Sequence, residues 1–141
     1  FVTNNKMAHF GTFNGNPLAM AGVRAIDRIA TTETLGAAEE LNHQALERIS
    51  DIIDEYQLPA HTVGFGVKGC VTWSTSPVRN YRDYKATDFG VAEAHWLFAL
   101  NRGIITPPGL DEQWLISLAH TQTEIDILVD DFAEFAKALR S

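Results

Sequence analysis

The sequence is poor in cysteine, in basic residues and in long hydrophobic runs. Its 141 residues include one cysteine, which excludes an internal disulfide, and no group of Cys and His residues has the spacing of a zinc site. No apolar stretch approaches the ~20 residues that a membrane-spanning helix needs. Eleven Lys and Arg residues against 18 Asp and Glu residues give a formal net charge of -7. This balance argues against a surface that binds nucleic acid, so we expect neither a nucleic-acid nor a membrane partner.

The rest of the composition is that of a folded domain. Hydrophobic residues make up 45% of the chain and charged residues 21%, a mixture typical of one compact domain. The single cysteine, Cys70, fits a reducing compartment, so we expect a cytoplasmic protein. The sequence opens with Phe1 and resembles no signal peptide, from which we expect a piece of a longer protein.

Two helices are expected in the first part of the chain. Asn16 and Pro17 are residues typical of a helix start, and apolar residues follow at helical spacing as far as Ile29. A second amphipathic helix is predicted from about Thr34 to Tyr56, and Pro59 ends it.

The second part of the chain alternates short strands with helices. The expected elements are a hairpin of strands 61–67 and 70–74 joined at Lys68-Gly69, a polar loop 76–87, a helix 88–101, strands 104–106 and 113–118, and a last helix opened by the capping box Thr121–Glu124. Together with the first two helices, this order predicts an α+β fold in which helices cover a small, mostly antiparallel sheet.

The densest candidate for a binding site is the run His9-Phe-Gly-Thr-Phe-Asn-Gly-Asn-Pro17. Gly11 and Gly15 permit tight turns, and Thr12 presents a hydroxyl close to a helix start, where a phosphate is favoured. On spacing alone, a structural turn in front of a capped helix is the more economical interpretation.

Two motifs carry a resemblance to a known family. Residues 11–17, followed by Leu18-Ala-Met-Ala-Gly22, resemble a signature of class III (fold type I) aminotransferases that depend on pyridoxal phosphate (PLP), with the glutamate-1-semialdehyde 2,1-aminomutase branch as the best match. A second run, from Gly103-Ile-Ile-Thr-Pro-Pro108 to Ile116-Ser-Leu-Ala-His-Thr121, is similar to the C-terminal run of that branch. Because the two motifs occur in the family's order and far apart in the sequence, they argue against a chance likeness.

The resemblance implies that the chain contains parts of two domains. Residues 1–30 would be the tail end of the large PLP-binding domain, with the phosphate-contact loop and a linking helix, and residues 31–141 would be the small C-terminal α+β domain. Thr12, with the backbone at Gly11, would contact the phosphate of PLP or its amine form PMP in the neighbouring subunit of a homodimer. Glu112 would lie at the substrate gate.

The resemblance also implies that the catalytic lysine lies upstream, in the large domain. The chain has four lysines, and none is in a suitable context: Lys6, Lys68, Lys85 and Lys137. We therefore expect no catalytic residue in this chain. The piece would be inactive alone, and the intact enzyme would transfer amino groups of small amino and keto substrates as a transaminase or an aminomutase.

An alternative function stays open from the residues alone. The missing lysine and the adequate size also suit a stand-alone, non-catalytic α+β domain for ligand binding or dimerisation. In either case we expect no metal site, because the five histidines show no ligand pairing. Trp73, Trp96 and Trp114 are expected to pack the sheet against its helices. The acidic residues of the last helix are expected on its solvated face: Asp126, Asp130, Asp131 and Glu134.

Overall fold

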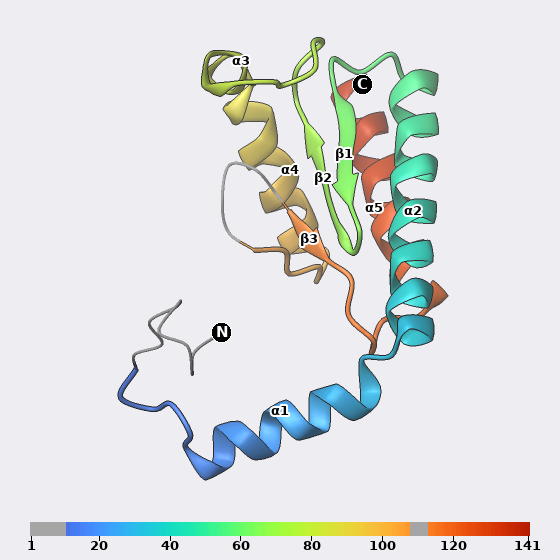
Figure 1. Ribbon diagram of the computed structural model, residues 1–141. Coiled ribbons are helices and arrows are strands. Elements are labelled where there is room, and N and C mark those ends of the chain that lie inside the picture. Colours follow the sequence, from blue (N-terminus) through green and yellow to red (C-terminus); the bar gives the residue numbers. More distant parts are fainter. Residues whose placement is uncertain (1–10, 108–112) are drawn as a thin grey trace. The chain divides into compact units, whose positions relative to one another are not determined.

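The computed structural model describes residues 11–107 and 113–141 (Figure 1). Its elements are α1 (Pro17–Ile29), α2 (Thr32–Glu55), β1 (His61–Phe65), β2 (Lys68–Thr72), α3 (Tyr81–Lys85), α4 (Phe89–Asn101), β3 (Trp114–Leu115) and α5 (Gln122–Leu139). The chain divides into two compact units, Phe1–Thr34 and Leu35–Ser141, which are described separately.

The first unit is dominated by α1, which begins where the sequence predicts. The side chain of Asn16 accepts hydrogen bonds from the backbone N–H of Leu18 at 2.9 Å and of Ala19 at 3.4 Å, and Pro17 occupies the first turn. None of the helix's side chains is buried. Leu18 and Ile26, on its apolar stripe, are 83% and 60% exposed. The described part of this unit therefore has no hydrophobic core of its own.

The second unit confirms the predicted α+β fold. Its three strands form an antiparallel sheet in the order β1-β2-β3, and α2 and α5 lie against one face of it (Figure 1). In the register, Phe65 faces Lys68, so the hairpin turns at Gly66 and Val67 rather than at the predicted Lys68-Gly69. Gly66 has a φ of 58°, a left-handed conformation that glycine adopts without strain.

The core of this unit lies between the sheet and the helices. Trp73, just after β2, is 2% exposed and meets Phe132 and Phe135 of α5, with ring centroids 6.1 and 5.8 Å away. Trp114 is 7% exposed. These two tryptophans pack the sheet against its helices as predicted, and Trp96 is partly buried.

Asn42 of α2 is the best-connected polar residue of the core. It is 1% exposed, and its Nδ2 donates to the carbonyl oxygens of Gly66 at 2.8 Å and Lys68 at 2.9 Å. Its Oδ1 accepts from Nε1 of Trp114 at 2.7 Å. The Trp114 ring in turn lies on Gly69, where a Cβ atom would come within 2.4 Å of it. One amide thus ties α2 to the hairpin turn and to β3.

Three sequence predictions about the connections are wrong. Residues 104–106 form no strand, because the N–H of Ile104 donates back to the carbonyl of Ala99 at 3.0 Å and the segment closes the end of α4. The strand predicted at 113–118 is reduced to the two residues of β3. The loop 76–87 contains the short helix α3, which Asn80 caps through its side chain.

The bounds of α4 and the start of α5 agree with the prediction. Asp88 caps α4 and Gly103, at a φ of 87°, follows its end, while Thr121 and Glu124 form the capping box of α5. No helix in residues 11–107 and 113–141 combines the length and the apolar character that crossing a membrane requires.

Replacing Asn42 by alanine is expected to lower the free energy of unfolding by about 3 kcal/mol, because two carbonyl groups and the indole N–H of Trp114 lose their partner inside the core. Urea unfolding measures this loss. Gln44→Ala is the matched control on the same helix, because Gln44 makes only an exposed bond to Glu40. A loss for Asn42→Ala no larger than that for Gln44→Ala would contradict the role given to Asn42.

Candidate functional site

The turn before α1 holds the predicted phosphate contact. The N–H of Asn14 donates to the carbonyl of Gly11 at 3.0 Å, and the N–H of Asn16 donates to the carbonyl of Phe13 at 3.1 Å. Gly15 has a φ of 76°, which explains a glycine there. A Cβ atom at Gly11 would come within 2.7 Å of the end of the Asn14 side chain, which is exposed and can turn away. Thr12 lies between these bonds and is exposed.

The free hydrogen-bond donors of this turn are not the backbone N–H groups at the start of α1. The amides of Leu18 and Ala19 already donate to Asn16, so the first turn of α1 is capped by the chain itself. Among the residues that the structure describes, neither the hydroxyl nor the backbone N–H of Thr12 has a hydrogen-bond partner. Both are neutral donors, which suit a phosphate dianion. The donors that this turn leaves available are therefore those of Thr12 rather than those at the end of the helix.

The predicted gate residue, Glu112, lies outside the described residues. The described chain resumes at Gln113, and Trp114 directly after it is anchored to Asn42. The role of Asn42 was not predicted from the sequence. Its position among the core-facing residues of α2 was a usable signal, because a buried amide needs partners for both its N–H groups and its oxygen.

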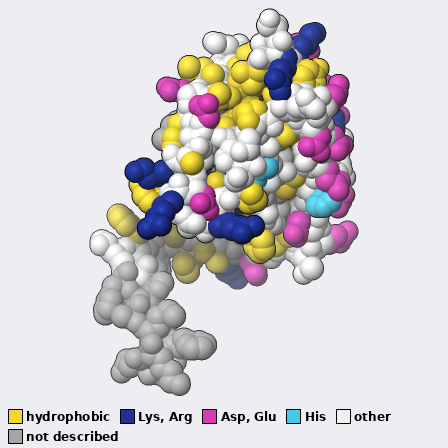
Figure 2. Space-filling model, turned by 90° about the horizontal axis from the view of Figure 1, so that it is seen from above, with side chains coloured by type: hydrophobic (Ala, Val, Ile, Leu, Met, Phe, Trp, Pro, Cys, Tyr) yellow, Lys and Arg dark blue, Asp and Glu magenta, His cyan; other side chains and the backbone are white. Residues whose placement is uncertain are grey.

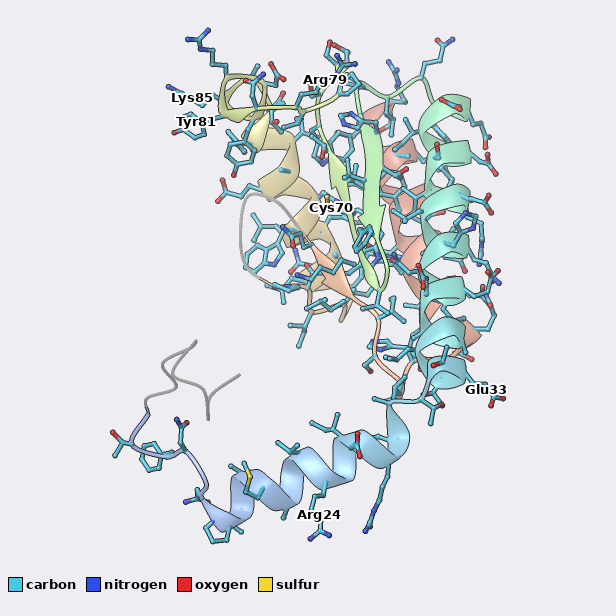
Figure 3. The ribbon with its side chains drawn as sticks, viewed as in Figure 1. Arg24, Glu33, Cys70, Arg79, Tyr81 and Lys85 are labelled. Atoms are coloured by element: carbon cyan, nitrogen blue, oxygen red, sulfur yellow. The ribbon has the colours of Figure 1, made fainter. Side chains whose placement is uncertain are left out.

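The lysines of the described chain lie on its surface. Lys68, Lys85 and Lys137 are all exposed, and Lys6 lies outside the described residues. Lys85 lies 6.0 Å from the ring centroid of Tyr81, and Figure 3 shows both residues on α3, at the upper left of the view. An exposed lysine lacks the burial and the neighbouring groups that activate an amine as a nucleophile.

Exposed charged side chains lie on several elements of the second unit. Arg79 and Arg82, which flank Tyr81 and the start of α3, are exposed. Acidic side chains gather on the side where α2 lies (Figure 2). Their members on that helix are exposed: Glu39, Glu40, Glu47, Asp51, Asp54 and Glu55. The described residues contain no group of three or more His, Cys, Asp or Glu side chains that could hold a metal ion.

The prediction for the acidic residues of α5 is wrong for Asp131. This residue is 2% exposed, and its carboxylate pairs with Nε of Arg102 at 2.5 Å. The partner lies at the end of α4, so the pair joins two helices, and a buried carboxylate without it would be costly. Asp126 also has a basic partner, because Arg48 of α2 lies 2.6 Å from it.

Two carboxyl groups of α5 have lowered pKa values. The side-chain hydrogen bond from Arg48 is the main cause that lowers the pKa of Asp126, and the bond from Gln122 adds to it. The hydroxyl of Thr121 lowers the pKa of Glu124, with the N–H of Thr121 as the second cause. Each carboxylate is therefore held in its charged form by neighbours that donate to it.

Comparison with known proteins finds relatives that match most of the chain. It is 30% identical over 122 residues to a glutamate-1-semialdehyde 2,1-aminomutase of Brevibacillus brevis, a match that covers 85% of this chain and 28% of the relative. The corresponding enzyme of Thermomicrobium roseum is 29% identical over 128 residues, covering 90% of this chain and 30% of the relative. The chain is homologous to glutamate-1-semialdehyde 2,1-aminomutases and class III transaminases. The family predicted from the two motifs is thereby confirmed.

Solved structures agree with the homology. A β-phenylalanine aminotransferase from Variovorax paradoxus superposes with a TM-score of 0.83 at 25% identity, covering 94% of this chain and 30% of that protein. A glutamate-1-semialdehyde aminomutase from Pseudomonas aeruginosa, in complex with PMP, gives a TM-score of 0.81 at 20% identity. The chain thus has the fold of a part of fold type I transaminases. It spans about 30% of the length of the homologues it matches. No protein-family model matches the chain.

Replacing Arg48 by glutamine is expected to raise the pKa of Asp126 towards its ordinary value, because the bond that lowers it most is lost. A carboxyl group with a lowered pKa stabilises the fold at neutral pH, and this stabilisation is lost as the pH falls through that pKa. The stability difference between the native chain and Arg48→Gln should therefore vanish in acid. Carboxyl-detected NMR titration measures the pKa, with Glu124 as the internal control. A pKa of Asp126 that stays the same in the variant would contradict this assignment.

Proposed function

We propose that this chain is the C-terminal portion of a PLP-dependent aminotransferase or aminomutase. Residues 1–30 would end the large PLP-binding domain, and residues 31–141 would form the small C-terminal domain. In the intact enzyme, bound PLP supplies the electron sink that makes amino-group transfer possible. The substrates would be small amino and keto compounds, in keeping with the aminomutases and transaminases to which the chain is homologous.

The homology over most of the chain carries this proposal. It covers 85% of the chain in one relative and 90% in another, yet about 30% of their length, as expected for one portion of such an enzyme. The described lysines are exposed, which supports a catalytic lysine elsewhere in the intact protein and an inactive piece. The alternative of a stand-alone ligand-binding or dimerisation domain explains neither the homology nor the exposed turn at Thr12.

Within this proposal, Thr12 binds the phosphate of the cofactor held by the partner subunit of a homodimer. Its hydroxyl and N–H are exposed donors on a turn that two backbone hydrogen bonds hold in shape. Because Asn16 caps α1, the first turn of the helix does not need a phosphate to satisfy the N–H groups of Leu18 and Ala19. Neutral donors also orient the dianion without adding a countercharge that would compete with groups closer to the reacting atoms. Glu112 would lie at the substrate entrance.

Thr12→Val in the full-length protein is expected to weaken PLP retention by about tenfold or more, because one hydrogen bond to a charged phosphate is lost. Thr12→Ser keeps the hydroxyl and should retain PLP close to the native level. The measurement is the PLP absorbance that remains with the protein after gel filtration, together with the melting temperature of each variant. Equal retention in all three proteins would remove Thr12 from the site. A full-length native protein that binds no PLP would overturn the proposal and favour the stand-alone domain.

A further inference from the structure

Asn16 joins the turn of Thr12 to the helix α1, and it uses two different groups to do so. Its backbone N–H donates to the carbonyl of Phe13 at 3.1 Å and closes the second of two consecutive turns. Its side-chain oxygen accepts the N–H groups of Leu18 at 2.9 Å and Ala19 at 3.4 Å, which caps the helix. The orientation of the turn on the end of α1 is therefore held by bonds on both sides of this one residue.

Thr12 lies in the first of the two turns. The N–H of Asn14 donates to the carbonyl of Gly11 at 3.0 Å, so Thr12 occupies the second position of that turn. The second turn begins at Phe13, the next residue. Neighbouring Cα atoms are about 3.8 Å apart, and the first and fourth Cα atoms of a turn are less than about 7 Å apart. The Cα atoms of Thr12 and Asn16 are therefore at most about 11 Å apart.

The cap of α1 is electrically neutral, although a charged cap would serve the helix at least as well. Asn, Asp and Ser are about equally good in this position, and an aspartate is favoured in addition by the helix dipole. The same chain caps α4 with Asp88, which accepts the N–H of Gly90 at 3.0 Å and that of Val91 at 3.1 Å. Helix capping alone therefore does not call for an uncharged residue at Asn16.

A negative charge at residue 16 would oppose the binding of a phosphate by Thr12. A phosphate ester carries about -1.5 to -2 charges at neutral pH. The distance between the two residues is comparable with the screening length, which is about 10 Å at 0.1 M salt, so a carboxylate there would repel the phosphate. The amide of Asn16 supplies the oxygen that the helix needs without this repulsion.

We propose that Asn16 is a positioning residue for the phosphate of the cofactor. It holds the turn of Thr12 on the end of α1 and keeps the surroundings of that turn free of negative charge. This inference rests on the proposed function, because it takes Thr12 as the residue that contacts the phosphate. Asn16 acts through Thr12 and through its own neutrality, and it needs no contact with the cofactor.

Two substitutions in the full-length protein separate the cap from its charge. Asn16→Ser keeps an uncharged cap, whereas Asn16→Asp keeps the cap and adds a negative charge. Both variants should keep the native melting temperature. Calorimetric titration with PMP measures the affinity of each protein. Asn16→Ser should bind PMP within about twofold of the native protein, and Asn16→Asp should bind it about threefold or more weakly than Asn16→Ser because of the repulsion.

The dependence on salt identifies the repulsion as the cause. The screening length falls from about 30 Å at 0.01 M salt to about 3 Å at 1 M. The ratio of the PMP dissociation constants of Asn16→Asp and Asn16→Ser should therefore fall towards one as salt is added, which a purely structural defect would not do. Gln44→Glu is the matched control, because it makes the same change from amide to carboxylate on α2, where Gln44 bonds only to Glu40. It should leave PMP binding unchanged.

Two results would refute the role of Asn16 and leave the proposed function standing. The first is equal PMP affinity of Asn16→Asp and Asn16→Ser in a protein in which Thr12→Val weakens PMP binding. The second is a weaker affinity of Asn16→Asp whose ratio to Asn16→Ser is the same at 0.01 M and 1 M salt. If the native full-length protein binds no PMP, the proposed function fails, and the role of Asn16 fails with it.

Discussion

The second unit depends on one buried amide more than on any other polar group. Asn42 uses both of its N–H groups on the hairpin turn and its oxygen on the indole of Trp114. Because it is 1% exposed, water cannot replace any of these partners. The close approach of Trp114 to Gly69 then fixes β3 against β2. With two residues, β3 is too short to hold its place by pairing alone, so the register of the sheet's edge follows from a side chain on α2.

The two units differ in how much of their structure they complete by themselves. The second has a continuous core of aliphatic and aromatic side chains, and ion pairs join α2 and α4 to α5. The first has a well-capped helix without buried side chains and a turn whose Thr12 has donors to offer. This contrast agrees with a homology that spans about 30% of much longer enzymes. A helix with an exposed apolar stripe and a turn with unpaired donors at Thr12 are both understandable as parts of a larger protein.

Local signals in the sequence predicted the helices well, because capping needs particular side chains at fixed positions. Asn16, Asp88 and Thr121 begin their helices as predicted. The prediction of a strand at 104–106 was wrong, since these residues close the end of α4. The prediction that Asp131 is solvated was wrong because its partner, Arg102, is distant in the sequence. The role of Asn42 was not predicted because its partners, Gly66, Lys68 and Trp114, are also distant in the sequence. The family was predictable from the two motifs and is confirmed, whereas the roles of Gly11, Thr12 and Glu112 stay predictions.

Hydrogen exchange at the indole N–H of Trp114 is the most direct test of the role of Asn42. If the bond to Asn42 holds β3 in place, this proton should exchange only when the whole unit unfolds, with the same opening free energy as the core amides of Ala45 and Ile49 in α2. Exchange of the indole proton far faster than that of those amides would show that β3 opens while the helix stays folded. That result would contradict the claim that the second unit depends on Asn42.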